Sequence, residues 1–226
     1  MSRIGLRIIE KKADELGPSI YDGFLAVGVA QASDCMGRLY GSAALVAIHE
    51  GSQRMVGRAL TVKSRPGDNL LIHQAIAMSG PGDVIVVDAG GCVAHAVIGE
   101  LMMLQARRQG VRGFVIDGAV RDAEAFARED FACFARGVSH RGPYKDGPGE
   151  INVPVSVGGL VVQPGDVVLG DRDGVLAIPP AHAASVLEMA LRKETSEAGT
   201  MQRIAAGTNE KPWLAAGIEA LRGDYA

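Results

Sequence analysis

Residues 83–122 decide the fold, and they read DVIVVDAGGCVAHAVIGELMMLQARRQGVRGFVIDGAVRD. The apolar run 84–87 is typical of a strand buried on both faces, and we expect it to stop at Asp88 and the glycines after it. After a loop, residues 99–110 have the apolar spacing of a helix, with Gly110 as its stop signal. Residues 113–120 predict a second buried strand. The pattern is therefore strand, turn, helix, strand.

A right-handed β-α-β crossover brings the ends of its two strands to the same edge of a sheet. Here that edge would carry Glu100, at the start of the helix, and the pair Arg121-Asp122, directly after the second strand. The first helical turn, near Gly99, has backbone N–H groups without helical partners, which suits an anion. We therefore expect Glu100, Arg121 and Asp122 to meet beside an anion-binding helix N-terminus.

The rest of the chain predicts an α/β protein with a single domain over residues 1–226, N-terminal helices within 1–32 and a C-terminal helical extension at 180–226. Helices are expected within 10–31, broken at Gly17-Pro18 with Ser19 as a candidate cap, and at 69–78, 124–129, 180–206 and 213–221. Strands are expected at 58–62 and 131–139, as a hairpin at 151–162 turning at Gly158-Gly159, and as two short strands within 164–179. Residues 140–150 predict a loop long enough to be a lid or a contact surface.

Composition narrows the class of protein. The 226 residues are 47% hydrophobic and 22% charged, with a formal net charge of −3, as in an ordinary globular chain. A basic stripe with interleaved aromatics is absent from the sequence, so nucleic-acid binding is not favoured. The sequence has neither a secretory signal pattern nor an apolar run long enough to cross a bilayer. Cys35, Cys92 and Cys133 are expected to be buried thiols in a reducing compartment. We expect a cytoplasmic protein without a membrane partner.

Four carboxylates lie at or between the ends of the two central strands: Asp88, Glu100, Asp117 and Asp122. Open sheets bind ligands at such edges, and carboxylates without paired histidines or thiolates favour a hard cation such as Mg²⁺ or Mn²⁺. The alternative for Asp122 is an ion pair that caps the next helix, and the alternative for Arg121 is a structural ion pair with Asp117 or Asp122.

With a metal, an arginine and free N–H groups at one edge, the pattern favours a small 2-oxo acid as ligand. The histidines are weaker candidates. His49 and His182 lie in exposed-looking segments, His73 is expected to pack on its helix, and His95 is a candidate for substrate contact. A Gly-x-Ser-x-Gly elbow and a Walker loop are absent from the sequence, while a Schiff-base lysine is left open.

The order of TVKSRPGDN, PGDVIVVDAGG, GELMMLQARRQGVRGFVIDGAVRD, GPGEINVPVSVGG and PGDVVLGDRDGVLAIP resembles one known family. It contains the 4-hydroxy-4-methyl-2-oxoglutarate / 4-carboxy-4-hydroxy-2-oxoadipate aldolases and the regulator of ribonuclease activity A. The likeness runs over about residues 33–207, and its specific part is Gly-Glu-Leu-Met with Gly-x-x-Arg-Asp. It implies a swivelling α-β-β-α sandwich with a long C-terminal helix, assembled as homotrimers or homohexamers with sites between subunits.

The resemblance to the aldolase branch implies class II chemistry, in which Mg²⁺ or Mn²⁺ supports cleavage of a 4-hydroxy-2-oxo acid to pyruvate and a second oxo acid, with oxaloacetate decarboxylation as a side activity. It implies that Asp122 binds the metal directly and that Glu100 holds the metal's waters. Arg121 would contact the pyruvate oxygen and stabilise the enolate. It also implies that Gly99, the backbone N–H groups of Leu101 and Met102, and the Asn69 side chain bind or orient the substrate. Glu197 of a neighbouring subunit would contact the metal through water, with Glu194 as the alternative.

Two features of the sequence agree with the enzymes and depart from the ribonuclease regulator: Asp122 in the Arg-Asp pair, and the long C-terminal helix. Two others depart from the aldolases, since Glu100 stands where several have Asp and the 140–150 loop differs. The second half of the substrate is therefore open. The rival readings are a non-enzymatic regulator that docks on a ribonuclease or helicase, and a dedicated oxaloacetate decarboxylase.

Overall fold

The computed structural model describes residues 5–11, 13–42, 44–50 and 54–223. The chain divides into two compact units, Met1–Ala190 and Leu191–Ala226. Helix α6 (Pro180–Ala205) begins in the first unit and continues into the second, which also holds α7 (Pro212–Gly223). These bounds confirm the two C-terminal helices expected from the sequence. Within the described ranges, every helix is too short or too polar to cross a lipid bilayer.

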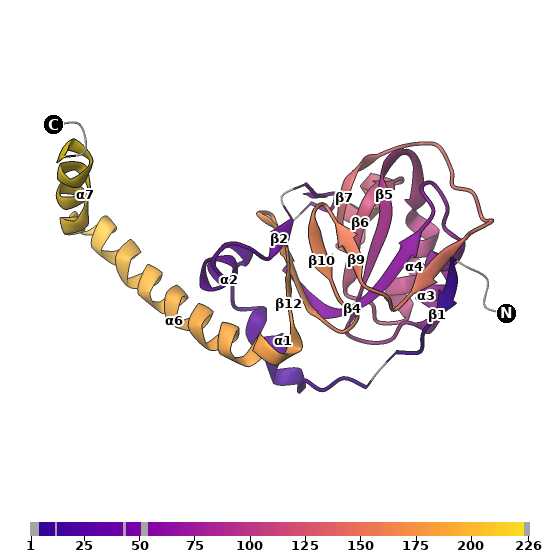
Figure 1. Ribbon diagram of the computed structural model, residues 1–226, viewed down its shortest axis with the longest axis horizontal. Helices are drawn as coiled ribbons and strands as arrows, with labels where there is room; N and C mark the ends of the chain where they lie inside the picture. The colour runs from indigo at the N-terminus through magenta and orange to yellow at the C-terminus, as the bar shows by residue number, and fades with distance from the viewer. Residues whose placement is uncertain (1–4, 12, 43, 51–53, 224–226) are drawn as a thin grey trace. The chain divides into compact units, whose positions relative to one another are not determined.

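The first unit is built on four parallel strands: β4 (Met55–Ser64), β5 (Asp83–Ile98), β6 (Gly113–Val120) and β7 (Ala132–Val138) (Figure 1). They occupy the middle of a mixed sheet whose order is β2-β12-β11-β4-β5-β6-β7-β3. The outer strands are antiparallel to their neighbours; they are β2 (Gly41–Ser42), β3 (Val46–Ala47), β11 (Val167–Asp171) and β12 (Gly174–Ile178). β8 (Gly149–Ile151) pairs with β4 and with β1 (Leu6–Ile8), and β9 (Val155–Val157) forms the expected hairpin with β10 (Leu160–Val162).

Three apolar clusters hold the layers together. Helices α3 (Leu70–Met78), α4 (Glu100–Arg108) and α5 (Ala123–Arg128) pack on one face of β4–β7. The opposite face packs against β9, β10 and one side of β11 and β12. The other side of β11 and β12 is covered by α1 (Pro18–Phe24), α2 (Val29–Cys35) and the first turns of α6. Helices therefore enclose two β layers, which is the α/β sandwich expected from the sequence.

Strand β5 is longer than the sequence predicts. The expected stop at Asp88 is wrong, because the chain stays paired with β6 as far as Ile98. Gly90 and Gly91 have φ of 64° and 68°, and the register shifts at and beyond this point. Left-handed glycines that shift the register produce a bulged strand instead of a turn. The edge at which α4 begins is therefore set by Ile98.

The N-terminal prediction needs a second correction. In the described part of 10–17 no residue is helical, and the first helix begins at Pro18 with Gly17 as its cap, so Ser19 lies inside α1. Proline is favoured at the first helical position because its missing N–H would have no partner there. Strand β1 was not expected either, since three exposed residues give no burial pattern.

Helix α5 follows Asp122 directly, and Phe126 anchors it in the core with 0% exposure. We expect Phe126→Ala to lower the free energy of unfolding by about 3–5 kcal/mol, because it leaves a cavity where a buried ring was. Urea unfolding measures this. Val161→Ala, at a side chain that is 58% exposed, is the control and should change the free energy of unfolding by less than about 0.5 kcal/mol. Equal effects from the two changes would contradict this account of how α5 is held.

Candidate active site

The ends of β5 and β6 lie side by side. Ile98 and Val120 are register partners, and the backbone N–H of Arg121 donates to the Ile98 carbonyl at 2.9 Å. Gly99, the next residue of the first strand, therefore faces Arg121 and Asp122. A Cβ placed on Gly99 would lie 2.6 Å from Asp122 Oδ2 and 2.9 Å from Arg121 Cγ, so a side chain at this position would collide with both. The absence of a side chain on Gly99 makes room for the pair.

Asp122 connects the β5-α4-β6 crossover to the β6-α5-β7 crossover through its side chain. Its backbone is left-handed, with φ 57° and ψ 43°, a conformation that aspartate tolerates better than most residues. In this conformation Asp122 Oδ2 accepts a hydrogen bond from the backbone N–H of Glu100 at 3.0 Å. The same oxygen lies 3.7 Å from Arg121 Nε. The sequence alternative, in which the Asp122 side chain caps the next helix, is wrong, because this side chain makes no cap bond to α5 and accepts the first N–H of α4 instead.

Glu100 is the first residue of α4, and its carboxylate is paired with Arg128 of α5. A depression of about 420 Å³ opens here and is lined by Glu100, Asp122, Ala123, Glu124, Ala125 and Arg128. Glu124 and Arg128 were not singled out in the sequence. A signal for them exists: they stand four residues apart on a predicted helix that directly follows Asp122, so both face the same side.

The N-terminus of α4 offers backbone donors beside these side chains. The N–H groups of Leu101 and Met102 belong to the first helical turn, where the helix itself supplies no acceptor. Leu101 is 80% exposed, whereas the Met102 side chain is 7% exposed. The helix N-terminus also carries a partial positive charge, which favours an anion at these N–H groups.

Asn69 lies under this junction as the cap residue of α3, the helix start that the sequence predicts. It is 3% exposed, and its Nδ2 donates to the Val97 carbonyl at 3.1 Å and lies 3.3 Å from the Met102 sulfur. Its Oδ1 is buried and has no hydrogen-bond partner among the described residues. Asn69 therefore braces the end of β5 against α4.

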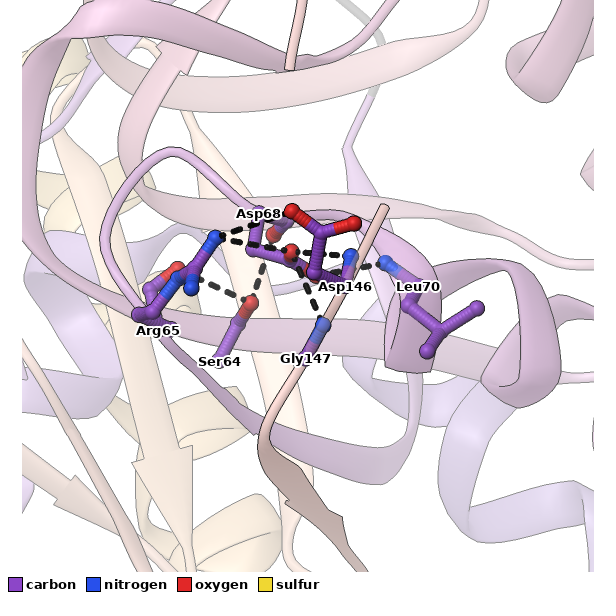
Figure 2. A network of polar contacts seen from close by, with 6 residues as sticks. All are labelled: Ser64, Arg65, Asp68, Leu70, Asp146 and Gly147. Atoms are coloured by element: carbon purple, nitrogen blue, oxygen red, sulfur yellow. Dashed lines mark hydrogen bonds and ion pairs between the residues drawn. The ribbon is translucent and has the colours of Figure 1, made fainter. Parts of the chain in front are cut away.

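The neighbouring Asp68 pins the long loop to this region (Figure 2). Its carboxylate is fully buried and accepts three backbone N–H groups, from Leu70 at 2.9 Å, Asp146 at 2.7 Å and Gly147 at 2.9 Å, with Arg65 Nη2 at 3.4 Å. The loop thus runs along the start of α3. A Cβ on its Gly142 would lie 3.5 Å from Arg121 Nη1, so the loop also passes the site arginine.

Two of the four predicted carboxylates lie elsewhere. Asp88 and Asp117 are register partners within the paired part of β5 and β6, upstream of Ile98 and Val120. Asp117 is ion-paired with Arg136, and Asp88 accepts the N–H of Gly90 at 3.0 Å. The expectation of a four-carboxylate edge is therefore wrong, because it assumed that β5 ends at Asp88. The structure brings together Glu100, Arg121 and Asp122, with Glu124 in the same depression.

The carboxylates of the depression, Glu100, Asp122 and Glu124, are candidate ligands for a hard cation. Within the described ranges, no group of three or more His, Cys, Asp or Glu residues could hold a metal ion by itself. Mg²⁺ commonly takes only one or two carboxylates and keeps several waters. The contacts described for the Asp122 carboxylate all involve Oδ2, its side chain is 45% exposed, and Glu100 and Glu124 line the same depression. The donors available are carboxylate oxygens with room for water, which fits Mg²⁺ or Mn²⁺.

Glu194 and Glu197 belong to the second unit, on α6. Glu197 Oε1 lies 3.6 Å from Lys193 Nζ, one turn earlier. Glu194 Oε2 is buried without a hydrogen-bond partner in the described part of the chain. The contribution of either glutamate to the site of a neighbouring copy stays a prediction.

The histidines and cysteines are only partly as expected. His49 is 2% exposed, so its predicted exposure is wrong: Nδ1 lies 3.1 Å from both the N–H and the carbonyl of Cys133. His73 is partly buried on α3, and burial lowers its pKa, with Lys145 adding to the effect. His95 contacts the loop, with its ring centroid 5.1 Å from that of Tyr144. Burial raises the pKa of the Cys133 thiol, whereas Cys35 and Cys92 are only partly buried.

Comparison with known proteins places these observations in context. A family model described as RraA-like, Aldolase/RraA, matches residues 29–177. A protein of Halalkalibacterium halodurans named "Putative 4-hydroxy-4-methyl-2-oxoglutarate aldolase" is 41% identical over 146 residues, which cover 65% of this chain and 70% of the relative.

Two solved structures share the fold. An uncharacterized protein from Pseudomonas syringae pv. tomato matches with a TM-score of 0.77 and 27% identity, over 87% of this chain and 96% of its own. The RNA-processing inhibitor RraA from Thermus thermophilis matches with a TM-score of 0.62 and 30% identity, over 67% of this chain and 92% of its own. These matches confirm the fold and the resemblance inferred from the sequence.

The Asp68 network predicts a stability effect. In Asp68→Asn, one carboxylate oxygen becomes an amide group that cannot accept the backbone N–H groups it faces. We expect the free energy of unfolding to fall by about 1–3 kcal/mol, as for a buried donor left unsatisfied, measured by urea unfolding. Asp146→Asn changes a side chain that is 73% exposed and should stay within about 0.5 kcal/mol of the unmodified protein. An Asp68→Asn protein as stable as Asp146→Asn would refute the role given to this carboxylate.

Proposed function

The chain belongs to the RraA-like family, and on that premise we propose that it is a class II pyruvate aldolase. It would cleave a 4-hydroxy-2-oxo acid, such as 4-hydroxy-4-methyl-2-oxoglutarate, into pyruvate and a second oxo acid, with oxaloacetate decarboxylation as a side activity. The observation that carries this proposal is the meeting of Arg121, the Asp122 carboxylate and the N-terminus of α4.

The pyruvate half of the substrate matches this arrangement group by group. Its carboxylate would accept hydrogen bonds from the backbone N–H groups of Leu101 and Met102 at the start of α4. Arg121, whose side chain is 45% exposed, would donate to the 2-oxo oxygen, which gains negative charge when the enolate forms. Gly99 leaves space between these donors because a side chain there would overlap Arg121 and Asp122.

Asp122 would bind the divalent cation directly, and Glu100, with Glu197 of a neighbouring subunit, would hold it through water. When bound, Mg²⁺ or Mn²⁺ would act as a Lewis acid that polarises the 2-oxo group. Hard oxygen donors in an open depression support this assignment.

Cleavage of the substrate requires a base, and Glu100 lies where it can position one. A base takes the proton of the 4-hydroxyl, the bond between C3 and C4 breaks, C4 becomes a carbonyl and the electron pair moves into the enolate of pyruvate. We assign the ordering of the water that takes this proton to the Glu100 carboxylate, which Arg128 holds in place. A proton from water then converts the enolate to pyruvate.

The same site would support oxaloacetate decarboxylation, because loss of carbon dioxide leaves the same pyruvate enolate. A dedicated decarboxylase is therefore the nearest rival. The other rival is a non-enzymatic regulator of a ribonuclease, which the likeness to the RNA-processing inhibitor from Thermus thermophilis favours. Against it stands the site itself, since a docking protein has no need of an arginine and a carboxylate at a helix N-terminus. We further propose a cytoplasmic homotrimer or homohexamer, with neither nucleic acid nor membrane as a partner.

Pyruvate release tests the proposal. With Mg²⁺ present, the protein should release pyruvate from 4-hydroxy-4-methyl-2-oxoglutarate and, more slowly, from oxaloacetate, each faster than in protein-free solution with the same Mg²⁺, and EDTA should abolish this protein-dependent release. A lactate dehydrogenase assay measures this, with pyruvate added to the EDTA arm to show that the coupling enzyme still works. Release from oxaloacetate alone would favour the decarboxylase. Silence on both substrates would favour the regulator.

Variants separate the two central side chains. Asp122→Asn keeps an oxygen that can accept the Glu100 N–H but removes the negative charge, so the fold should persist while metal-dependent turnover is lost. Arg121→Ala should lower kcat by roughly a hundredfold or more, because it removes charge stabilisation made mainly in the transition state.

Asp173→Asn and Arg172→Ala are matched controls at exposed positions of the β11–β12 turn and should leave kcat unchanged. Activity that survives Asp122→Asn with its Mg²⁺ dependence intact would remove Asp122 from the proposed metal site.

A further inference from the structure

A second cavity, of about 670 Å³, lies at the amino ends of β4–β7. It is lined by the residues that begin these strands and by α1 with the segment before it. Because the strands are parallel, this is the opposite edge of the sheet from Gly99 and Asp122. Small-molecule sites typically measure roughly 300–1,000 Å³. The cavity is therefore large enough for a ligand and separate from the candidate active site.

The cavity has an apolar floor. Met55, Val56, Val111 and Phe131 line it, and each is at most 6% exposed. These side chains are held by the sheet and the core, so the floor is preformed. Such a surface favours the apolar body of a ligand over a fully hydrated ion.

Two acids of the wall, the buried Asp83 and the exposed Asp14, already have partners within the protein. Asp83 Oδ2 is 2.6 Å from Lys11 Nζ and accepts the Gly80 N–H at 2.8 Å. Asp14 accepts the Tyr21 hydroxyl and the Leu16 N–H, each at 3.0 Å. Burial raises the pKa of Tyr21, and Asp14 adds to this, so its phenol remains a donor to Asp14 at neutral pH. Asp14 and Asp83 are therefore engaged with the protein, and the wall also carries the exposed Asp22 and Asp130, so an anionic ligand needs cations at the rim.

Two arginines supply such cations. Arg54 and Arg112 both line the cavity and are exposed. Arg54 uses one N–H, from Nη1, on the Leu25 carbonyl at 3.0 Å. In the part of the chain that the structure describes, Arg112 has no side-chain partner and neither guanidinium is paired with a carboxylate. A guanidinium presents several donors in a plane and matches the oxygens of a carboxylate, sulfonate or phosphate group.

We propose that this cavity binds a small organic anion, with its acidic group on Arg54 and Arg112 and its apolar body on the floor formed by Met55, Val56, Val111 and Phe131. The site is independent of the proposed aldolase chemistry, because it shares no residue with the depression around Asp122.

Fluorescence titration of the full chain tests the proposal with two matched probes. The anionic probe is 8-anilinonaphthalene-1-sulfonate, and the neutral one is N-phenyl-1-naphthylamine, which has the same rings without the sulfonate. The double variant Arg54→Gln and Arg112→Gln removes the proposed anion contacts. The double variant Arg108→Gln and Arg172→Gln removes the same charge at exposed positions outside the cavity and is the control. Circular dichroism verifies that both variants are folded.

We expect saturable binding of the sulfonate by the unmodified protein and the control. The dissociation constant should rise by about tenfold or more in the cavity variant, since charge-assisted contacts are lost. The neutral probe should bind all three proteins alike. The same sulfonate affinity in the cavity variant and the control, or a lack of saturable binding to the unmodified protein, would overturn the proposal.

Discussion

The hydrogen bond from the Glu100 N–H to Asp122 Oδ2 is the contact on which the candidate site depends. It ties Asp122, the second residue after β6, to the first residue of α4, so both crossovers begin at the same point. Two conditions permit it. Asp122 must adopt a left-handed backbone, and Gly99 must lack a side chain, since a Cβ there would lie 2.6 Å from the same oxygen. The loss of either condition would separate the carboxylate, the arginine and the helix N-terminus.

The surrounding core fixes this junction without taking part in its chemistry. The Asn69 side chain donates a hydrogen bond to the Val97 carbonyl near the end of β5 and contacts the Met102 sulfur of α4. Asp68 gathers the N–H groups of Leu70, Asp146 and Gly147, which places the long loop beside α3 (Figure 2). Buried carboxylates that accept several backbone donors are strong and directional constraints. Rigid support of this kind is what a site needs if it is to stabilise charge that develops during a reaction.

Sequence reasoning found the junction because the β-α-β topology brings its residues to the same edge of the sheet. A right-handed crossover brings Glu100, Arg121 and Asp122 together whatever the length of the strands. It failed where local pattern was ambiguous. Two glycines after Asp88 read as a turn, yet they are a bulge, so Asp88 and Asp117 were wrongly assigned to the same edge. His49 looked exposed because its segment is polar, whereas its imidazole bonds the backbone of Cys133 in the interior. Glu124 and Arg128 were missed although their spacing of four residues on a predicted helix after Asp122 places them on one side of that helix.

The most direct test of the central claim follows only the pyruvate half of the substrate. If Arg121, Asp122 and the start of α4 stabilise a pyruvate enolate, the protein should exchange the methyl protons of pyruvate for deuterium in D₂O. Proton NMR follows this exchange without the second half of the substrate. The account predicts exchange with Mg²⁺ present and its loss with EDTA. Exchange no faster than in protein-free solution with the same Mg²⁺ would contradict it.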